Sequence, residues 1–226
     1  MRRSAIVLAI GLLAATAATP AWAGTIVTAN WSMDSTTAMA DSSGHGNNGT
    51  PTNVTAVRGV VGNGYHFNGW TSIALVPSST GLNPGLANFR FSAYARLAEV
   101  PGGSDYDPMR KGLTTSPGGD YKLEFFPNRA RTLAKAKCTF RGSAGQAVLM
   151  AGPNVADHAW HAVSCARTRR AIVLTVDGVP YSKPATIGSI ANTAPLAIGG
   201  KYLGGAPGNT INHFYGDLDE ARVEVG

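Results

Sequence analysis

The densest group of residues that could do acid–base chemistry is the run Asp217-Leu218-Asp219-Glu220, near the end of the chain. Glycoside hydrolysis needs two carboxyl groups facing one cleft, ~5–5.5 Å apart in retaining enzymes. A strand carrying an E-x-D-x-x-E pattern could supply that pair, and this run lacks the spacing. Asp217 and Asp219 do share a strand face, but a hydrolase is not our first prediction.

Other catalytic arrangements are also incomplete in the sequence. A G-x-S-x-G nucleophile elbow is absent, and so is a C-x-x-C redox or zinc motif. A polysaccharide lyase needs a group that neutralises a uronate and a Tyr or His base, which Tyr121-Lys122 or Lys201-Tyr202 could offer. The five histidines are scattered, and we interpret His66 and His161 as packed side chains. We therefore predict no catalytic residues.

Sugar binding makes a different demand, namely exposed aromatic rings and planar polar groups on loops. Polar loops are expected over residues 102–108 and 114–120. We predict that Trp70, Tyr106, Arg110 and Tyr202 contact a ligand, and Tyr215 is a further aromatic candidate. Each of these rings could instead be ordinary packing at the rim.

The elements that must carry these loops are strands. Charged residues make up only 14% of the chain, and its 28 glycines, with many Thr, Val, Asn and Ser, favour strands and tight turns. Residues 89–97 alternate apolar and polar side chains, and Asp177-Gly178 is a strong hairpin signal. Strands recur without a repeat or linker, which predicts one all-β domain, a two-sheet antiparallel β-sandwich of jelly-roll type, over residues 24–226.

Residues 1–23 have the pattern of a signal peptide. Arg2 and Arg3 precede a short apolar run, and Ala21-Trp22-Ala23 resembles a cleavage site. This predicts a secreted protein, with a membrane anchor as the alternative and no membrane insertion later in the chain. Without Arg2 and Arg3, 17 of the 19 basic residues remain against 13 acidic ones. That net charge of +4 is small and the basic residues are scattered, so the sequence does not favour nucleic-acid binding.

Cys138 and Cys165 are the two cysteines of the chain. Export to an oxidising compartment favours a disulfide between them over two separate buried thiols. The strands that hold them are expected to be neighbours, which would give the short Cα separation that a disulfide needs.

Three stretches together resemble the laminin-G-like group of the concanavalin A-like lectin/glucanase superfamily. The opening stretch contains N-W-S-M-D, D-S-S-G-H-G-N-N-G and G-N-G-Y-H-F-N-G, the middle one contains W-H-A-V and L-T-V-D-G, and the closing one reads F-Y-G-D-L-D-E-A-R-V. They lie at residues 30–34, 41–49 and 62–69, at residues 160–163 and 174–178, and at residues 214–223. They occur in the family order and span nearly all of residues 24–226.

The resemblance implies two antiparallel sheets. Phe67 and Trp160 are expected mid-strand with apolar neighbours, so we interpret them as core anchors rather than surfaces for a ligand. The resemblance also suggests a structural calcium ion, for which Asp34, Asp41 and Asp219 lie in the relevant motifs. Alternatively, Asp41 caps its own turn and Asp219 pairs with an arginine such as Arg222.

Together these features predict a monomeric, secreted module that binds a polysaccharide or glycan without cleaving it. The alternatives are a polysaccharide lyase or glycoside hydrolase on the same scaffold, and an extracellular protein-interaction domain.

Overall fold

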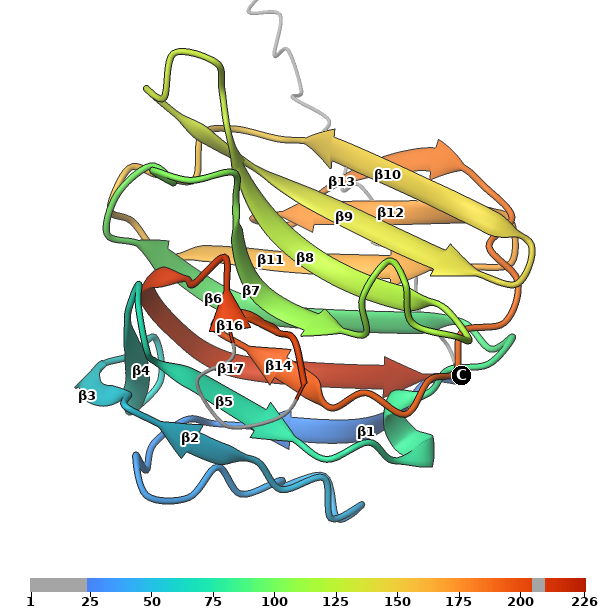
Figure 1. Cartoon of the computed structure of the whole chain (residues 1–226), viewed down its shortest axis with the longest axis horizontal. Helices are drawn as coiled ribbons and strands as arrows, with labels where there is room; N and C mark the ends of the chain where they lie inside the picture. The colour runs from blue at the N-terminus through green and yellow to red at the C-terminus, as the bar shows by residue number, and fades with distance from the viewer. Residues whose placement is uncertain (1–23, 205–209) are drawn as a thin grey trace, which may run out of the picture.

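A computed structural model describes residues 24–204 and 210–226 of the chain, and it is nearly all β (Figure 1). The predicted signal peptide, residues 1–23, lies outside the described residues. No helix within the described part is long and apolar enough to cross a membrane. The predicted antiparallel β-sandwich is confirmed.

The first sheet has eight strands in the order β13-β12-β11-β6-β17-β4-β3, and β1 also pairs with β17. Every pairing in it is antiparallel. Its strands are β1 (Ile26–Trp31), β3 (Thr55–Arg58), β4 (Asn63–Asn68), β6 (Phe89–Leu97), β11 (His161–Arg167), β12 (Ala171–Val176), β13 (Val179–Pro184) and β17 (Tyr215–Val225).

The second sheet has seven strands in the order β10-β9-β8-β7-β14-β5-β2. They are β2 (Thr50–Thr52), β5 (Ile73–Val76), β7 (Tyr106–Lys111), β8 (Asp120–Pro127), β9 (Ala134–Gly142), β10 (Gly145–Ala151) and β14 (Leu196–Ile198). A two-stranded sheet, β15 (Lys201–Tyr202) with β16 (Thr210–Ile211), and a 3₁₀ turn, η1 (Thr80–Leu82), complete the described elements.

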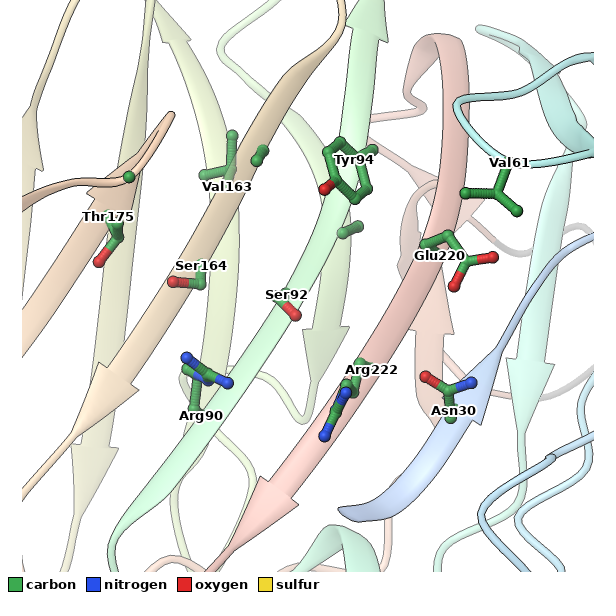
Figure 2. Close-up of a pocket in the computed structure, with 13 residues that line it drawn as sticks. Asn30, Val61, Arg90, Ser92, Tyr94, Val163, Ser164, Thr175, Glu220 and Arg222 are labelled. Atoms are coloured by element: carbon green, nitrogen blue, oxygen red, sulfur yellow. The ribbon is translucent and has the colours of Figure 1, made fainter. Parts of the chain in front are cut away.

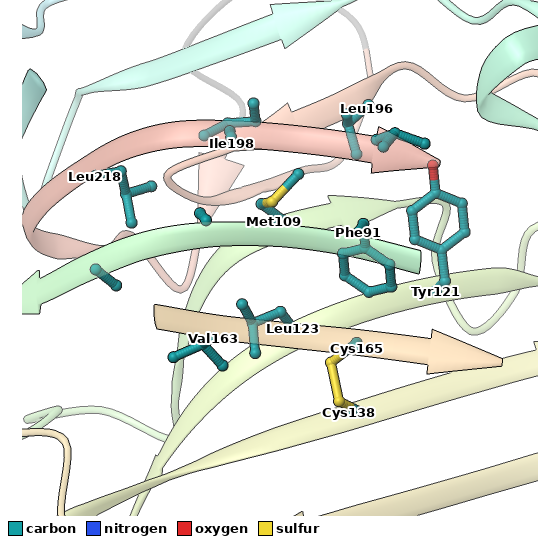
Figure 3. Close-up of a cluster of buried hydrophobic side chains, with 14 of the residues drawn as sticks. Phe91, Met109, Tyr121, Leu123, Cys138, Val163, Cys165, Leu196, Ile198 and Leu218 are labelled. Carbon is teal, nitrogen blue, oxygen red and sulfur yellow. A yellow bond between two sulfur atoms is a disulfide. The ribbon is translucent and has the colours of Figure 1, made fainter. Parts of the chain in front are cut away.

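The core lies between the two large sheets (Figure 3). Strand β6 begins and ends at the predicted residues and buries every second side chain against the facing sheet. For example, the rings of Phe89 and Tyr121 meet edge to face with centroids 4.6 Å apart. This alternation places the even-numbered residues of β6 on the outer face of the first sheet.

The Cys138–Cys165 disulfide is present, with Cα atoms 5.6 Å apart. The two strands that hold the cysteines do lie close together, as expected, but they face each other from different sheets. Cys138 lies in β9 of the second sheet and Cys165 in β11 of the first, so the bond crosses the core and joins the sheets (Figure 3). Both side chains point inward because the apolar alternation of each strand directs them there.

We predict that replacing both cysteines with alanine lowers the free energy of unfolding by about 3–4 kcal/mol, because the crosslink restricts the unfolded chain. Urea unfolding at neutral pH measures the change. Reduction of the unaltered protein by a phosphine is the matched control and should give a similar loss. An unchanged unfolding midpoint in the double variant would contradict this prediction.

Candidate functional site

A groove of about 390 Å³ lies on the outer face of the first sheet, over β1, β17, β6, β11 and β12 (Figure 2). Its described lining combines hydroxyl, amide, guanidinium and carboxylate groups with one phenol ring. The lining residues are Asn30, Val61, Arg90, Ser92, Ala93, Tyr94, Ala162, Val163, Ser164, Thr175, Gly178, Glu220 and Arg222.

The strand register explains why these polar groups converge. Ser92 of β6 pairs with Ser164 of β11 on one side and with Arg222 of β17 on the other. Arg222 in turn pairs with Asn30 of β1. Four strands therefore contribute one polar row across the outer face, and Tyr94 lies two residues along β6 on the same face.

A β-bulge in β17 places Glu220 in the groove. Between Asp219 and Arg222, β17 advances three residues while its partner β6 advances two, from Tyr94 to Ser92. Glu220 is the extra residue and has a positive φ of 50°. Burial, and then the charges of Asp219 and Asp34, raise the pKa of Glu220. Figure 2 shows its carboxylate near Asn30 and Val61.

Two arginines line the other part of the groove and are oriented by one carboxylate. Arg90 Nε donates to Oε2 of Glu224, and Arg222 Nη2 lies 3.0 Å from Oε1 of the same residue. The Glu224 side chain is nearly buried, whereas both arginine side chains are about one-third or more exposed. Nε of Arg222 is buried, so the groups available to acceptors such as sugar hydroxyls are the terminal N–H groups that Glu224 does not bind.

Asp34 and Asp219, two of the predicted calcium ligands, hold the turn between β3 and β4. Asp219 accepts N–H groups from Val60 at 2.8 Å and Val61 at 3.0 Å. Asp34 accepts the N–H of Asn63 at 2.9 Å, and this hydrogen bond lowers the pKa of Asp34. Burial raises the pKa of Asp219 even though its N–H donors act against that shift.

Two glycines allow the carboxylates to approach this turn. A Cβ atom at position 59 would lie 2.5 Å from Oδ2 of Asp219, and one at position 62 would collide with Oδ1 of Asp34. Gly62 also has a φ of +59°, which favours glycine. The glycine-rich pattern of residues 59–64 therefore serves the anchoring of this turn.

Asp41, the third predicted calcium ligand, folds its own loop. Its two oxygens accept the N–H groups of Asn30, Ser43 and Asn47 and the hydroxyl of Ser43, at 2.8–2.9 Å. Calcium needs six to eight oxygen ligands, and most lone pairs of Asp41 and Asp219 already accept protein donors. The three predicted residues therefore do not form a fitting donor set for one ion.

A different trio of carboxylates, Asp105, Asp107 and Glu124, lies close enough to share an ion. Basic side chains of the protein already balance the negative charge of this trio. Arg110 pairs with Asp107 at 3.1 Å, and Lys122 and Lys137 both pair with Glu124. Burial raises the pKa of Asp107 to about 7, so this carboxyl group is partly protonated near neutral pH. We interpret the cluster as a buried ionic network rather than a cation site.

The predicted sugar-binding residues do not come together in the groove. Tyr106 was expected on a loop, and this is wrong: it begins β7, is buried, and packs edge to face on Phe214. Arg110 is also buried in β7, where it pairs with Asp107. Tyr202 is half-buried in β15. Trp70 is 78% exposed, beyond the end of β4.

The interpretation of Trp160 as a core anchor is also wrong, while Phe67 is fully buried as predicted. Val163 and Cys165 of β11 face the core, so Trp160 points with the even-numbered residues to the outer face. There the guanidinium of Arg96 lies 4.9 Å from its ring centroid. The groove residues of β6 were missed by sequence reasoning, although the alternation of residues 89–97 already assigned them to the outer face.

Comparisons with known proteins agree with this architecture. The family model for the laminin G domain matches residues 135–217, from β9 to the start of β17. This part of the β-sandwich is similar to a laminin G domain. The resemblance predicted from the three sequence stretches is thereby confirmed. No curated protein matches the sequence.

Solved structures with the same fold include two binding domains and one domain of an arabinanase. The laminin-G-like domain superposes on the binding domain of Paraclostridial Mosquitocidal Protein 1 with a TM-score of 0.66 at 16% identity, over 87% of this chain and 48% of that one. The second structure is domain 4 of AbnA, a GH43 extracellular arabinanase from Geobacillus stearothermophilus, in complex with arabinotriose. Its TM-score is 0.60 at 18% sequence identity, and the match covers 89% of this chain and 93% of that one.

The third structure is the ligand binding domain of botulinum neurotoxin serotype D in complex with N-acetylneuraminic acid. Its TM-score is 0.64 at 9% sequence identity, and the match covers 88% of this chain and 47% of that one. The laminin-G-like domain thus spans about half of each toxin chain and most of the arabinanase domain. At these identities the similarity establishes the fold alone.

His161 ties β11 to the turns at one end of the sheet. Its Nδ1 lies 2.7 Å from Oδ2 of Asp177, and its Nε2 lies 2.9 Å from Oδ1 of Asp157. Burial disfavours the charged imidazole, but the hydrogen bonds and charges of the two aspartates outweigh it and raise the pKa of His161. The packed position predicted for His161 is confirmed by its burial.

We predict that the stability contributed by His161 depends on pH. Because its folded pKa lies above the ~6.5 of an unfolded histidine, this contribution is complete below about pH 6.5 and is lost as pH rises through the folded value. The unfolding free energy of the native protein should fall over this range more than that of a His161→Asn variant. Urea unfolding at a series of pH values measures the difference, with His45→Asn at an exposed histidine as control. Parallel pH profiles for the native protein and His161→Asn would refute the assignment.

Proposed function

We propose that this laminin-G-like domain is a secreted, monomeric module that binds carbohydrate in the groove on the outer face of the first sheet and does not cleave it. The observation that carries this proposal is the lining of the groove. Tyr94 offers a ring for stacking, and Asn30, Arg90, Arg222 and Glu220 offer planar polar groups for sugar hydroxyls. The sugar-bound domains among the structures of the same fold support the proposal.

The carboxylates of the described groove support the proposal of binding without cleavage. Glu220 is the one carboxylate in its described lining, whereas hydrolysis by the usual mechanism needs two that face the same sugar linkage. Glu224 is nearby, but its oxygens are held by Arg90 and Arg222 and its side chain is 6% exposed. Neither residue is therefore placed as one half of a catalytic pair.

We predict that residues 24–226 are retained by at least one polysaccharide in a panel of plant, fungal and animal glycans, without release of new ends. Replacing Tyr94 with alanine should weaken this binding by about tenfold, equivalent to ~1.4 kcal/mol, because the stacking surface is lost. Affinity electrophoresis followed by calorimetry measures retention and affinity. Assays for reducing ends and for the absorbance of unsaturated sugars measure cleavage.

The matched control is Tyr181→Ala, which removes a half-buried phenol from the edge strand β13, outside the groove. Cleavage that depends on a single acidic or basic residue would overturn the binding-only proposal in favour of an enzyme. Capture of a protein partner that persists after glycan removal, without retention by any polysaccharide, would favour a protein-interaction domain.

Calcium was expected from the family resemblance, and its role can be measured separately. Since the oxygens of Asp41 and Asp219 already accept protein N–H and O–H groups, we expect the melting temperature to be unchanged by a chelator or by millimolar calcium. Scanning calorimetry with EDTA, and then with added calcium, makes the measurement. A reproducible rise with calcium that Asp34→Asn abolishes would restore the predicted site.

A further inference from the structure

A second group of polar and aromatic residues lies beside the groove on the same outer face. We call it the His66 row, consisting of His66, Arg96, Trp160, Tyr215 and Asp217. Asp217 connects its members: Oδ1 lies 2.7 Å from Nδ1 of His66, and Oδ2 accepts Nε of Arg96 at 2.8 Å. The guanidinium of Arg96 covers the Trp160 ring, and the Tyr215 ring meets the His66 ring edge to face.

The strand register places the His66 row directly next to the groove. His66 of β4 pairs with Asp217 of β17, and Asp217 pairs with Arg96 of β6. Arg96 follows Tyr94 of the groove by two residues and so faces the same side of the sheet. From Ser92 in the groove to Arg96 in the row, the strand rises ~13 Å.

The contacts within the row leave hydrogen-bonding groups for a ligand. Asp217 is 11% exposed and uses its oxygens to orient its two partners, whose side chains are 36% (His66) and 32% (Arg96) exposed. The contacts with Asp217 use Nδ1 of His66 and Nε of Arg96, and Nε2 of His66 and the terminal nitrogens of Arg96 take no part in them. Trp160 and Tyr215 are half-buried. Aromatic rings and oriented planar donors are what sugar recognition uses.

We propose that the groove and the His66 row form one extended site, whose ligand is a linear oligosaccharide rather than a single sugar. This inference rests on the proposed function. A single sugar ring is too short to reach from the Ser92 row to Arg96, so a monosaccharide would occupy the groove alone. A longer chain that follows β6 would gain the contacts of the His66 row in addition.

The test uses size-fractionated fragments of the polysaccharide that the panel retains, from one sugar unit to six. We expect affinity in calorimetry to rise at least tenfold from the shortest to the longest fragments. Arg96→Gln and His66→Gln should each remove most of that gain and leave the affinity for the shortest fragments unchanged. Tyr94→Ala should weaken the binding of short and long fragments alike. Arg169→Gln, at an exposed arginine outside both groups, controls for the loss of one positive charge.

The outcomes separate this inference from the proposed function. If affinity does not change with fragment length, or if Arg96→Gln and His66→Gln leave the long-fragment affinity intact, the extended site is refuted while binding in the groove stands. If both variants weaken short and long fragments equally and lower the melting temperature, the row is structural and the inference also fails. If no polysaccharide is retained, the proposed function fails, and the extended site fails with it.

Discussion

The arrangement of the first sheet depends on strand β17, which hydrogen-bonds three other strands. One edge of β17 pairs with β6 along nearly its whole length, while the other edge pairs first with β4 and then with β1. A strand that changes partners along one edge must absorb an irregularity, and here the bulge at Glu220 does so. Without it, the residues after Asp219 would swap faces, and Arg222 would point into the core.

The bulge also links stability to the groove. Asp219 lies before the extra residue and is fully buried, where it satisfies the N–H groups of the turn that follows β3. Glu220 takes the positive φ and reaches the groove instead. The bulge thus separates the roles of two adjacent carboxylates. Asp219 holds the turn after β3, and Glu220 lines the groove. The dense acidic run that suggested catalysis in the sequence is explained by this division of roles.

Sequence reasoning was most successful where a periodic pattern was long and undisturbed. The bounds of β6 and β12, and the hairpin at Asp177-Gly178, where both residues have positive φ, follow from local alternation and turn chemistry. Strand β7 was taken in part for a loop, because a bulge and the polar residues Asp107 and Arg110 hide its alternation.

Long-range geometry was not available from local pattern. The sequence places Cys138 and Cys165 in strands, but which sheets those strands join depends on pairings between distant segments. The groove was missed for the same reason, since its polar row takes Asn30, Ser92, Ser164 and Arg222 from four separate strands. Its apolar neighbours predict Trp160 in the core, whereas the structure places it directly before β11 and against Arg96 on the outer face.

The two outer faces of the sandwich differ in how accessible their polar groups are, and this difference favours the first sheet as the side for the proposed ligand. On the second sheet, Glu124 points outward from β8 yet is 1% exposed, because the segment before β7 covers it. Asp105 of that segment accepts a hydrogen bond from Asn212, which ties the chain after β16 to the same face. Ligand groups would have to displace this network and leave charges unpaired, at a cost of several kcal/mol. On the first sheet, the equivalent outward positions of β6 are partly exposed and already hold polar groups in fixed orientations, so a sugar can bind there without such a cost.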